Sequence, residues 1–435
     1  MSLRYRRRLS AREAEFVDSP QRNIGFSYTL RGNLDTAALL RAFGRLREEF
    51  PLLAGRVLAV DDGFDFVVDE SCKAPQDVVR LLRAKPGTQV PPNLNPSSSL
   101  ATLDVVTYDE DWHCVTPWCN HAAADGRLWL FLVQRLWSLY TQEADGAPES
   151  SLLPDAGRFP GAMEYLLAQR NIREGSITGE ERLRGARWSG SPPRAGAMLA
   201  ENFQLQSTRL QLNERLTTDL RALAARRSIS MHGVVAGAVA LAERAAFVDV
   251  PEGEPVPMAF ISPVEMRARV VPPIAIDEVT NFMGTAYTQL EVSCENKLLE
   301  LGKTLSDQLI ADLKDGLILG AMASPTLPER GGVGVVLNNI GVIPSPSLPE
   351  NLIAEDVAWS FYVEPGQMRS VLESMPKDAE VPMEVGSIYY FYSFCGMLNI
   401  DLMHMPGCAS EQARKSLVRR VIQLLVETAQ IKEVC

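Results

Sequence analysis

Residues 121–126, His121-Ala-Ala-Ala-Asp125-Gly126, lie where a short apolar segment ends and a long helical one begins. The preceding stretch, residues 112–119, is rich in aromatic and β-favouring side chains, which predicts a β-strand. The following run, residues 127–142, is apolar on almost all sides, as in a helix buried in a large domain. A histidine at this junction has small neighbours and lies near the backbone N–H groups of a helix start. The junction is therefore the first candidate for a chemical site.

Length and charge narrow the class of protein. A chain of 435 residues predicts two domains of roughly 200 residues each. Its 46% hydrophobic and 22% charged residues are typical of a globular protein. With 43 basic and 54 acidic residues, the net charge of -11 argues against nucleic acid or an anionic membrane as the main partner.

Cysteine usage and the chain start indicate a cytoplasmic protein. The seven cysteines have irregular spacing, with no Cys-x-x-Cys pair and no zinc pattern, which predicts free thiols and no metal. The basic residues 1–8 are followed by Glu13 and Glu15 instead of an apolar core, unlike a signal peptide. The longest run of small apolar residues, 233–242, is too short to span a bilayer.

The rest of the chain has a mixed α/β pattern. Asp35 is a predicted helix cap, because an apolar stripe with 3,4 spacing follows it. Residues 55–60 and 64–68 predict a hairpin. Further strands are expected at 24–30, 100–108, 203–212, 257–262, 284–292, 333–338, 357–363, 387–394 and 397–403, and helices at 161–170, 217–226, 231–247, 297–314 and 410–430. A shift towards Gly, Pro, Ser and Arg predicts an N-terminal lobe over 1–175, a linker over 176–200 and a C-terminal lobe over 201–435.

Several segments together resemble, in order along nearly the whole chain, the thioester-dependent acyltransferases with a His-His-x-x-x-Asp-Gly motif. This superfamily includes chloramphenicol acetyltransferase, alcohol O-acetyltransferases, phthiocerol dimycocerosyl transferases, plant BAHD enzymes and the condensation domains of peptide synthetases. The matching segments besides 121–126 are 8–13, 30–40, 50–53, 230–238, Pro263-Val-Glu-Met-Arg267, Asn281-Phe-Met-Gly284 and Leu337-Asn338-Asn339-Ile-Gly341. Asn120 stands where the doubled motif has its first histidine, and the resemblance assigns catalysis to the second, His121.

The resemblance implies a fold and an activity. The fold would be α/β, with two chloramphenicol-acetyltransferase-like lobes, each a mixed β-sheet with helices, and an active-site channel between them. The activity would be that of an O-acyltransferase in secondary metabolism, moving an acyl group from a thioester to a hydroxyl of a lipophilic or polyketide-like acceptor. Acyl-CoA or an acyl-phosphopantetheine carrier protein would be the co-substrate, with no permanently bound cofactor and no metal. The partners would be a small-molecule acceptor and an acyl carrier protein.

The expected acyl transfer suggests a role for each of most of the predicted site residues. A thioester is already electrophilic, so a hydroxyl needs chiefly a general base and correct placement, which His121 can supply without an acyl-enzyme. Donors for the oxyanion would be the Gly126 N–H and the Asn281 side chain. Asn338 and Asn339 predict a tight turn that borders the substrate channel.

Asp125 has two alternative roles. If residues 121–125 were helical, its carboxylate could orient the ring of His121. In the family it pairs instead with an arginine, whose matching position is Arg267, and we favour this structural pairing. Loss of either partner would leave a buried charge unpaired.

Simpler roles are favoured for the remaining reactive and charged side chains. A Cys119–His121 dyad is disfavoured, and His113, His232 and His404 are interpreted as structural. The clustered arginines at 4, 6, 7, 8, 12, 182, 184, 187 and 194 are interpreted as solvated, and the sharper hypothesis for them is a dock for a coenzyme A phosphate or an acidic carrier protein. Rival functions are condensation-type amide formation and a non-catalytic member that binds a carrier protein.

Overall fold

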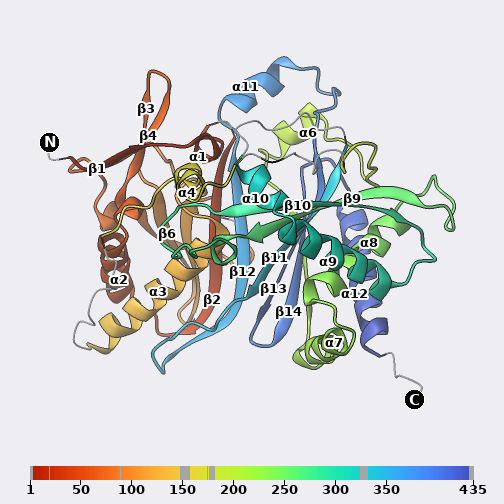
Figure 1. Ribbon diagram of the computed structural model, residues 1–435. Helices are drawn as coiled ribbons and strands as arrows, with labels where there is room; N and C mark the ends of the chain where they lie inside the picture. The colour runs from red at the N-terminus through yellow and green to blue at the C-terminus, as the bar shows by residue number, and fades with distance from the viewer. Residues whose placement is uncertain are drawn as a thin grey trace. The chain divides into compact units, whose positions relative to one another are not determined.

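The computed structural model describes residues 3–18, 20–88, 90–146, 157–173, 175, 182–323 and 332–430 (Figure 1). The chain forms two compact units. Unit 1 comprises Met1–Arg170, Arg267–Phe282 and Pro344–Ser370; unit 2 comprises Asn171–Met266, Met283–Ile343 and Val371–Cys435. Two segments from the second half of the chain thus belong to unit 1. The predicted boundaries at 175 and 200, which concern continuous lobes, stay a prediction.

Unit 1 is built on a five-stranded mixed sheet in the order β12-β2-β7-β6-β5. Its strands are β2 (Gln21–Gly32), β5 (Val79–Arg83), β6 (Ala101–Asp109), β7 (Trp112–Asn120) and β12 (Leu352–Glu364). β5 and β6 are parallel, and the other pairs are antiparallel. The edge strand β12 comes from the second half of the chain and pairs with β2 along its whole length. The sheet therefore holds the end of β7, where His121 follows, in its interior.

The helices of unit 1 follow the predicted capping and burial. α2 (Thr36–Glu49) begins after Asp35, whose carboxylate accepts from the N–H groups of Ala37 and Ala38. α3 (Gly126–Asp145) buries nine large side chains, and its Trp137 packs edge-on against Tyr28 of β2. The one-sided burial of α2 and the wide burial of α3 match their sequence patterns. Unit 1 also contains the short helices α1 (Ala11–Ala14) and α4 (Met163–Gln169) and the 3-10 turns η1 (Pro51–Ala54), η2 (Pro75–Val78) and η3 (Arg267–Arg269). The short helix α11 (Gln367–Ser374) spans the boundary between the two units at Ser370.

The basic start of the chain is a strand, which the sequence did not predict. β1 (Leu3–Arg8) pairs with β4 (Gly63–Asp69) of the β3–β4 hairpin, β3 being Arg56–Val60. Arg6 lies 2.6 Å from Asp65. Arg8 lies 2.7 Å from Asp62. Arg6 and Arg8 are exposed to solvent, as interpreted, and the neighbouring hairpin also presents carboxylates to them.

Unit 2 contains a six-stranded mixed sheet in the order β10-β9-β11-β13-β14-β8. Its strands are β8 (Gln206–Leu212), β9 (Val256–Glu265), β10 (Met283–Val292), β11 (Gly334–Val342), β13 (Val385–Phe394) and β14 (Met397–His404). Its helices are α6 (Ala195–Ala200), α7 (Glu214–Arg226), α8 (Met231–Ala245), α9 (Leu298–Lys314), α10 (Leu317–Met322) and α12 (Glu411–Ala429). Together with unit 1, this confirms the predicted two lobes with mixed sheets; the channel between the lobes stays a prediction.

The small residues of α8 allow a neighbouring helix to approach closely, as predicted. A Cβ added at Gly237 would lie 2.2 Å from the carbonyl oxygen of Leu298 in α9. A Cβ added at Gly233 would meet the backbone of Gly302 at 2.6 Å. Larger side chains at these two positions would force α8 and α9 apart.

Residues 176–181 of the predicted linker lie outside the described residues. The described part, residues 182–200, is more structured than its composition indicates. Arg182 lies 2.6 Å from Asp312. The indole N–H of Trp188 donates to Ser387 at 2.9 Å, and the indole fills the space beside Gly386. The segment is therefore packed onto unit 2, because tertiary contacts compensate for its weak local preference.

In the described part of the chain, no helix is long and apolar enough to cross a membrane. Over the same residues, no group of three or more His, Cys, Asp or Glu side chains is arranged to hold a metal ion.

A buried carboxyl group in unit 2 makes the stability of the fold depend on pH. Glu243 of α8 is fully buried and accepts from Tyr389 at 2.8 Å and from Ser189 at 3.0 Å. Burial raises the pKa of its carboxyl group above the usual 4.5, against the lowering effect of these hydrogen bonds. The neutral acid is therefore the form that the fold favours.

We predict that Glu243→Gln becomes more stable than the unchanged protein as pH rises from about 4.5 to 8. A raised pKa contributes stability below the unfolded-state pKa, and this contribution is lost as pH approaches the folded-state pKa. Urea unfolding of both proteins across this pH range measures the growing difference. A growing advantage of the glutamate with rising pH would contradict the prediction.

Candidate active site

His121 directly follows β7, and the loop of small residues after it fixes one ring nitrogen. Its Nδ1 lies 3.1 Å from the carbonyl oxygen of Ala124. Because a carbonyl only accepts, Nδ1 carries the hydrogen in the neutral ring, which leaves the lone pair on Nε2. The side chain is half-buried. His121 thus has the tautomer that a general base acting through Nε2 requires.

The ring of His121 stacks on Phe16, with centroids 4.3 Å apart and planes 13° apart. The guanidinium of Arg22 lies over the ring of Phe16, 5.5 Å from its centroid. Burial is the main cause that lowers the pKa of His121 below its usual 6.5; Arg22 also lowers the pKa, whereas the carboxylate of Asp125 and the backbone hydrogen bonds raise it. The ring is therefore neutral, and able to take a proton, at pH 7.

Asn120 is a structural residue, and its hydrogen bonds explain why a histidine is not required there. The side chain is fully buried. Its Nδ2 donates to the backbone oxygens of Phe16 and Arg22, each at 3.3 Å, and its Oδ1 accepts from the Ala122 N–H at 3.1 Å. The Asn120 amide thus joins the loop after β7 to the backbone of Phe16, which stacks on His121, and of Arg22, which lies over Phe16.

Asp125 caps α3 and anchors a distant segment of unit 1. Its Oδ1 accepts from the N–H groups of Arg127 at 3.1 Å and Leu128 at 2.8 Å. Its Oδ2 accepts from the Phe282 N–H at 2.9 Å and lies 2.8 Å from Nη1 of Arg267. Both ionic side chains are almost completely buried, at 3% exposure for Arg267 and 0% for Asp125. The ion pair that the resemblance implies is present, and both carboxylate oxygens are engaged by donors other than the ring of His121.

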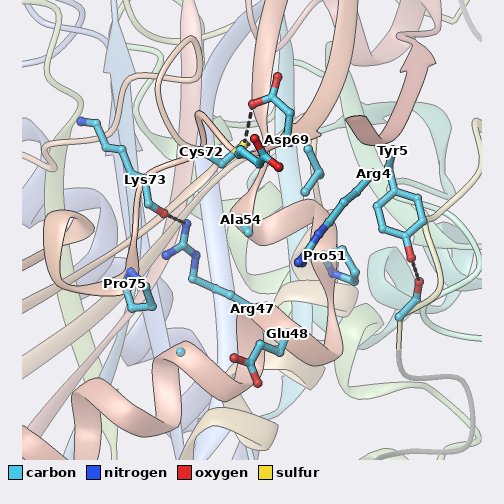
Figure 2. A pocket seen from close by; sticks show the side chains of 14 residues that line it. Arg4, Tyr5, Arg47, Glu48, Pro51, Ala54, Asp69, Cys72, Lys73 and Pro75 are labelled. Carbon is cyan, nitrogen blue, oxygen red and sulfur yellow. Dashed lines mark hydrogen bonds between the residues drawn. The ribbon is translucent and has the colours of Figure 1, made fainter. Parts of the chain in front are cut away.

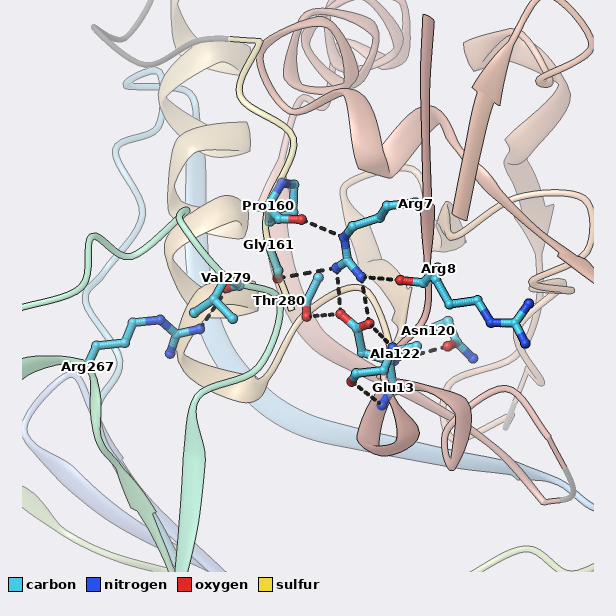
Figure 3. A network of polar contacts seen from close by, with 11 residues as sticks. Arg7, Arg8, Glu13, Asn120, Ala122, Pro160, Gly161, Arg267, Val279 and Thr280 are labelled. Carbon is cyan, nitrogen blue, oxygen red and sulfur yellow. Dashed lines mark hydrogen bonds and ion pairs between the residues drawn. The ribbon is translucent and has the colours of Figure 1, made fainter. Parts of the chain in front are cut away.

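A second buried carboxylate extends this network towards the N-terminus (Figure 3). Glu13 accepts two hydrogen bonds from Arg7, at 2.6 and 2.7 Å, and one from the hydroxyl of Thr280. The backbone oxygen of Thr280 accepts from the Asp125 N–H at 2.8 Å. Arg7 also donates to the backbone of Pro160 and Gly161. Arg7 is thus a partner of a buried acid, and its interpretation as solvated is wrong.

The other predicted site residues lie in both units. Asn281 lies between Thr280 and Phe282, both bonded to Asp125, so the structure brings it beside the motif. Gly126 is the first residue of α3, and its N–H is among the helix-start donors that lack an intrahelical acceptor.

Asn338 and Asn339 lie in unit 2, on β11, in register with Tyr390 and Phe391 of β13. The predicted tight turn is wrong, because these residues continue a strand. The pairing register shifts between Asn339 and Gly341, where Oδ1 of Asn339 accepts from the Gly341 N–H at 2.9 Å. Gly341 has a φ of +87°, which favours glycine. The Asn-Asn-x-Gly pattern that predicted a turn therefore corresponds to a β-bulge within the strand.

The remaining cysteine and histidine candidates have other partners. Cys119 is fully buried, its thiol lies 3.3 Å from the Asn120 carbonyl, and burial raises its pKa, so it has neither the contact nor the ionisation of a nucleophile. Each of the three other histidines has a polar partner, in agreement with their structural interpretation: Thr107 for His113, Ser262 for His232 and Ser387 for His404.

Sequence reasoning missed Phe16, Glu13 and Thr280. The sequence could have indicated Glu13, because the Ser10-x-x-Glu13 spacing is that of the capping box these residues form at the start of α1. Nothing local distinguishes Phe16, whose role depends on a contact with His121, a residue far along the chain.

The chain is similar to known proteins over much of its length. The family model of the phthiocerol/phthiodiolone dimycocerosyl transferase C-terminus matches residues 201–403. Phthiocerol/phthiodiolone dimycocerosyl transferase of Mycobacterium leprae is 29% identical over 349 residues, covering 77% of this chain and 81% of that protein. The Mycobacterium tuberculosis enzyme of the same name is 29% identical over 348 residues, with 77% and 81% covered.

Solved structures extend the likeness to the whole chain. Polyketide synthase associated protein 5 of Mycobacterium tuberculosis superposes with a TM-score of 0.76 and 26% identity, covering 98% of both chains. A trichothecene 15-O-acetyltransferase of Fusarium sporotrichioides gives 0.65 and 12%, with 97% and 95% covered. The first condensation domain of the CDA synthetase gives 0.63 and 16%, with 98% and 97% covered. The last two likenesses concern the fold alone.

We predict that Asp125→Asn and Arg267→Met each destabilise the protein by about 3–5 kcal/mol, because each leaves one buried charge without its partner. The double variant should lose less than the sum, by about 0.5–3 kcal/mol. Urea unfolding of the four proteins measures this coupling. Strictly additive losses would mean that the two side chains act independently.

Proposed function

We propose that this chain, which is similar to the thioester-dependent acyltransferases with the chloramphenicol-acetyltransferase-like fold, moves an acyl group from a thioester to a hydroxyl of a lipophilic or polyketide-like acceptor. The donor is an acyl-CoA or an acyl carrier protein. Two of the similar proteins are named for dimycocerosyl transfer and for association with a polyketide synthase, which supports this donor and acceptor class. The observation that carries the proposal is the fixed tautomer of His121.

In the proposed reaction, Nε2 of His121 takes the proton of the acceptor hydroxyl as its oxygen attacks the thioester carbonyl. A C–O bond forms and a tetrahedral oxyanion results; then the C–S bond breaks and the thiolate takes the proton back from Nε2. The base is regenerated without an acyl-enzyme. The lowered pKa of His121 keeps it neutral before the attack, which is the state the first proton transfer needs.

The proposed oxyanion donors are the Gly126 N–H and the Asn281 side chain. Both residues adjoin atoms bonded to Asp125: Gly126 follows it, and Asn281 lies between its partners Thr280 and Phe282. The Asp125–Arg267 pair would thus hold the donors in place without touching substrate. A border of the substrate channel at Asn338 and Asn339 is a further proposal.

Amide formation and carrier-protein binding are the two rival functions. An amine acceptor would use the same base and give an amide. A non-catalytic carrier-protein binder would need no neutral histidine with a free Nε2, and the stacked, hydrogen-bonded ring of His121 favours the enzyme. Cytoplasmic location belongs to the same proposal.

We predict that His121→Ala lowers kcat/KM by about 10²–10⁴-fold, because it removes the general base. The assay measures thiol release from short- and long-chain acyl-CoAs with a panel of alcohols and amines. His113→Gln is the matched control, since His113 lies on the preceding strand β7 and bonds Thr107 and the Gly32 carbonyl. Undiminished turnover in His121→Ala would overturn the assignment, and turnover with amines alone would favour amide formation.

We predict that kcat/KM of the unchanged protein falls on acidification through a pKa below 6.5, because protonated His121 cannot act as a base. Phe16→Ala should move this pKa upwards, since water replaces the stacked ring and stabilises the imidazolium. Phe16→Tyr preserves the stacking and should leave the pH profile unchanged. An unmoved profile in Phe16→Ala would show that the stack does not control the base.

A further inference from the structure

A cavity of about 700 Å³ lies in unit 1 near the β1 strand, α2 and the residues after β4 (Figure 2). Its volume is in the range of small-molecule sites. Both basic and apolar side chains line the cavity. The cations are Arg4, Arg47 and Lys73, and the apolar groups include Tyr5, Pro51 and Val68. All of the residues lining the cavity belong to unit 1, and none of them is assigned to the acyl-transfer reaction.

Arg47 is the buried member of this set. Its side chain is 4% exposed. Its Nη2 donates to the backbone oxygen of Lys73 at 2.7 Å, as Figure 2 shows, and its guanidinium lies 5.9 Å from the centroid of the Phe43 ring. Its Nε has no hydrogen-bond partner. Among the described residues, Arg47 forms no ion pair with a carboxylate. Such a buried cation is costly unless an anion joins it.

The acidic side chains of the cavity do not neutralise Arg47. Asp69 accepts from Arg56 at 3.2 Å and from the hydroxyl of Ser71. Glu48 and Glu70 are exposed to solvent, where water screens their charge. Burial lowers the pKa of Arg47, and the nearby Cys72 and Asp77 only oppose this effect. The cavity therefore holds a buried cation that forms no ion pair with a carboxylate among the described residues, although Asp77 lies near enough to raise its pKa.

Arg4 and Lys73 place two more cations at the same cavity; both are exposed, so water screens their charge as it does that of Glu48 and Glu70. Three cations suit a phosphate group, which carries more charge and more acceptor oxygens than a single carboxylate. The volume exceeds that of a phosphate ion, and the apolar lining can pack against an organic body.

We propose that this cavity binds a phosphate ester, with its phosphate against Arg47 and between Arg4 and Lys73. The site is independent of His121. The phosphate belongs either to a small phosphate ester or to coenzyme A, which share the recognised chemistry.

Titration of the full chain with inorganic phosphate, at ionic strength matched with chloride, tests the site by calorimetry. Arg47→Met should weaken phosphate binding at least 10-fold. Arg45→Met is the matched control, because Arg45 lies on the same helix, pairs with Glu143 and does not line the cavity, and its affinity should stay within about 3-fold of the unchanged protein. His121→Ala should bind phosphate normally, which separates this site from the proposed reaction.

Stability provides a second readout. Without phosphate, Arg47→Met should unfold at the same or a higher temperature than the unchanged protein, because it removes an unpaired buried charge. If the variant fails to fold, the exposed pair Arg4→Gln and Lys73→Gln tests the same site and should weaken binding at least 3-fold. If coenzyme A displaces phosphate, the bound phosphate group belongs to coenzyme A. If only glycerol 3-phosphate displaces it, the natural ligand is a small phosphate ester other than the acyl donor. The absence of phosphate binding to the unchanged protein, or equal binding by Arg47→Met, would overturn the proposal.

Discussion

The carboxylate of Asp125 is the interaction on which the candidate site depends. A buried negative charge requires donors on all sides, and this one has two N–H groups at the start of α3, the Phe282 N–H and the guanidinium of Arg267. These donors come from two segments far apart in sequence. Satisfying the charge therefore fixes the loop that carries His121 against residues 267–282. Asp125 positions the histidine through the backbone, and its carboxylate also raises the pKa of the His121 ring.

The N-terminal segment completes the same arrangement from the other side of the loop. Glu13, bonded to Arg7 and Thr280, holds α1 against residues 279–280. Three residues later Phe16 stacks on His121, and Asn120 bonds the Phe16 carbonyl. One polar network thus sets the position of the ring and the apolar surface that keeps it neutral. The Asn120 amide fits this position, because it can both donate to two carbonyls and accept from an N–H.

Arg267 and Arg47 show how the role of a buried arginine depends on whether a carboxylate balances its charge. Both are almost completely buried in unit 1. Arg267 lies against Asp125, so its charge is balanced within the chain. Arg47 has a backbone carbonyl and an aromatic ring but, among the described residues, no carboxylate, and a cavity lies beside it. A balanced buried pair braces the fold, whereas an unbalanced cation at a cavity indicates a ligand.

The sequence by itself determined the local elements with strong periodicity or caps, such as α2 after Asp35 and α3 after Asp125, because these depend on neighbours a few residues away. The motif and its family resemblance also selected His121 and paired Asp125 with Arg267. Only the tertiary structure decided that the basic start is a strand, that Arg7 serves a buried acid, and that Phe16 covers His121. These features depend on contacts between residues distant in the chain, for which composition and spacing carry no signal. The tautomer of His121 was likewise a tertiary result, since it required the Ala124 carbonyl to turn towards Nδ1.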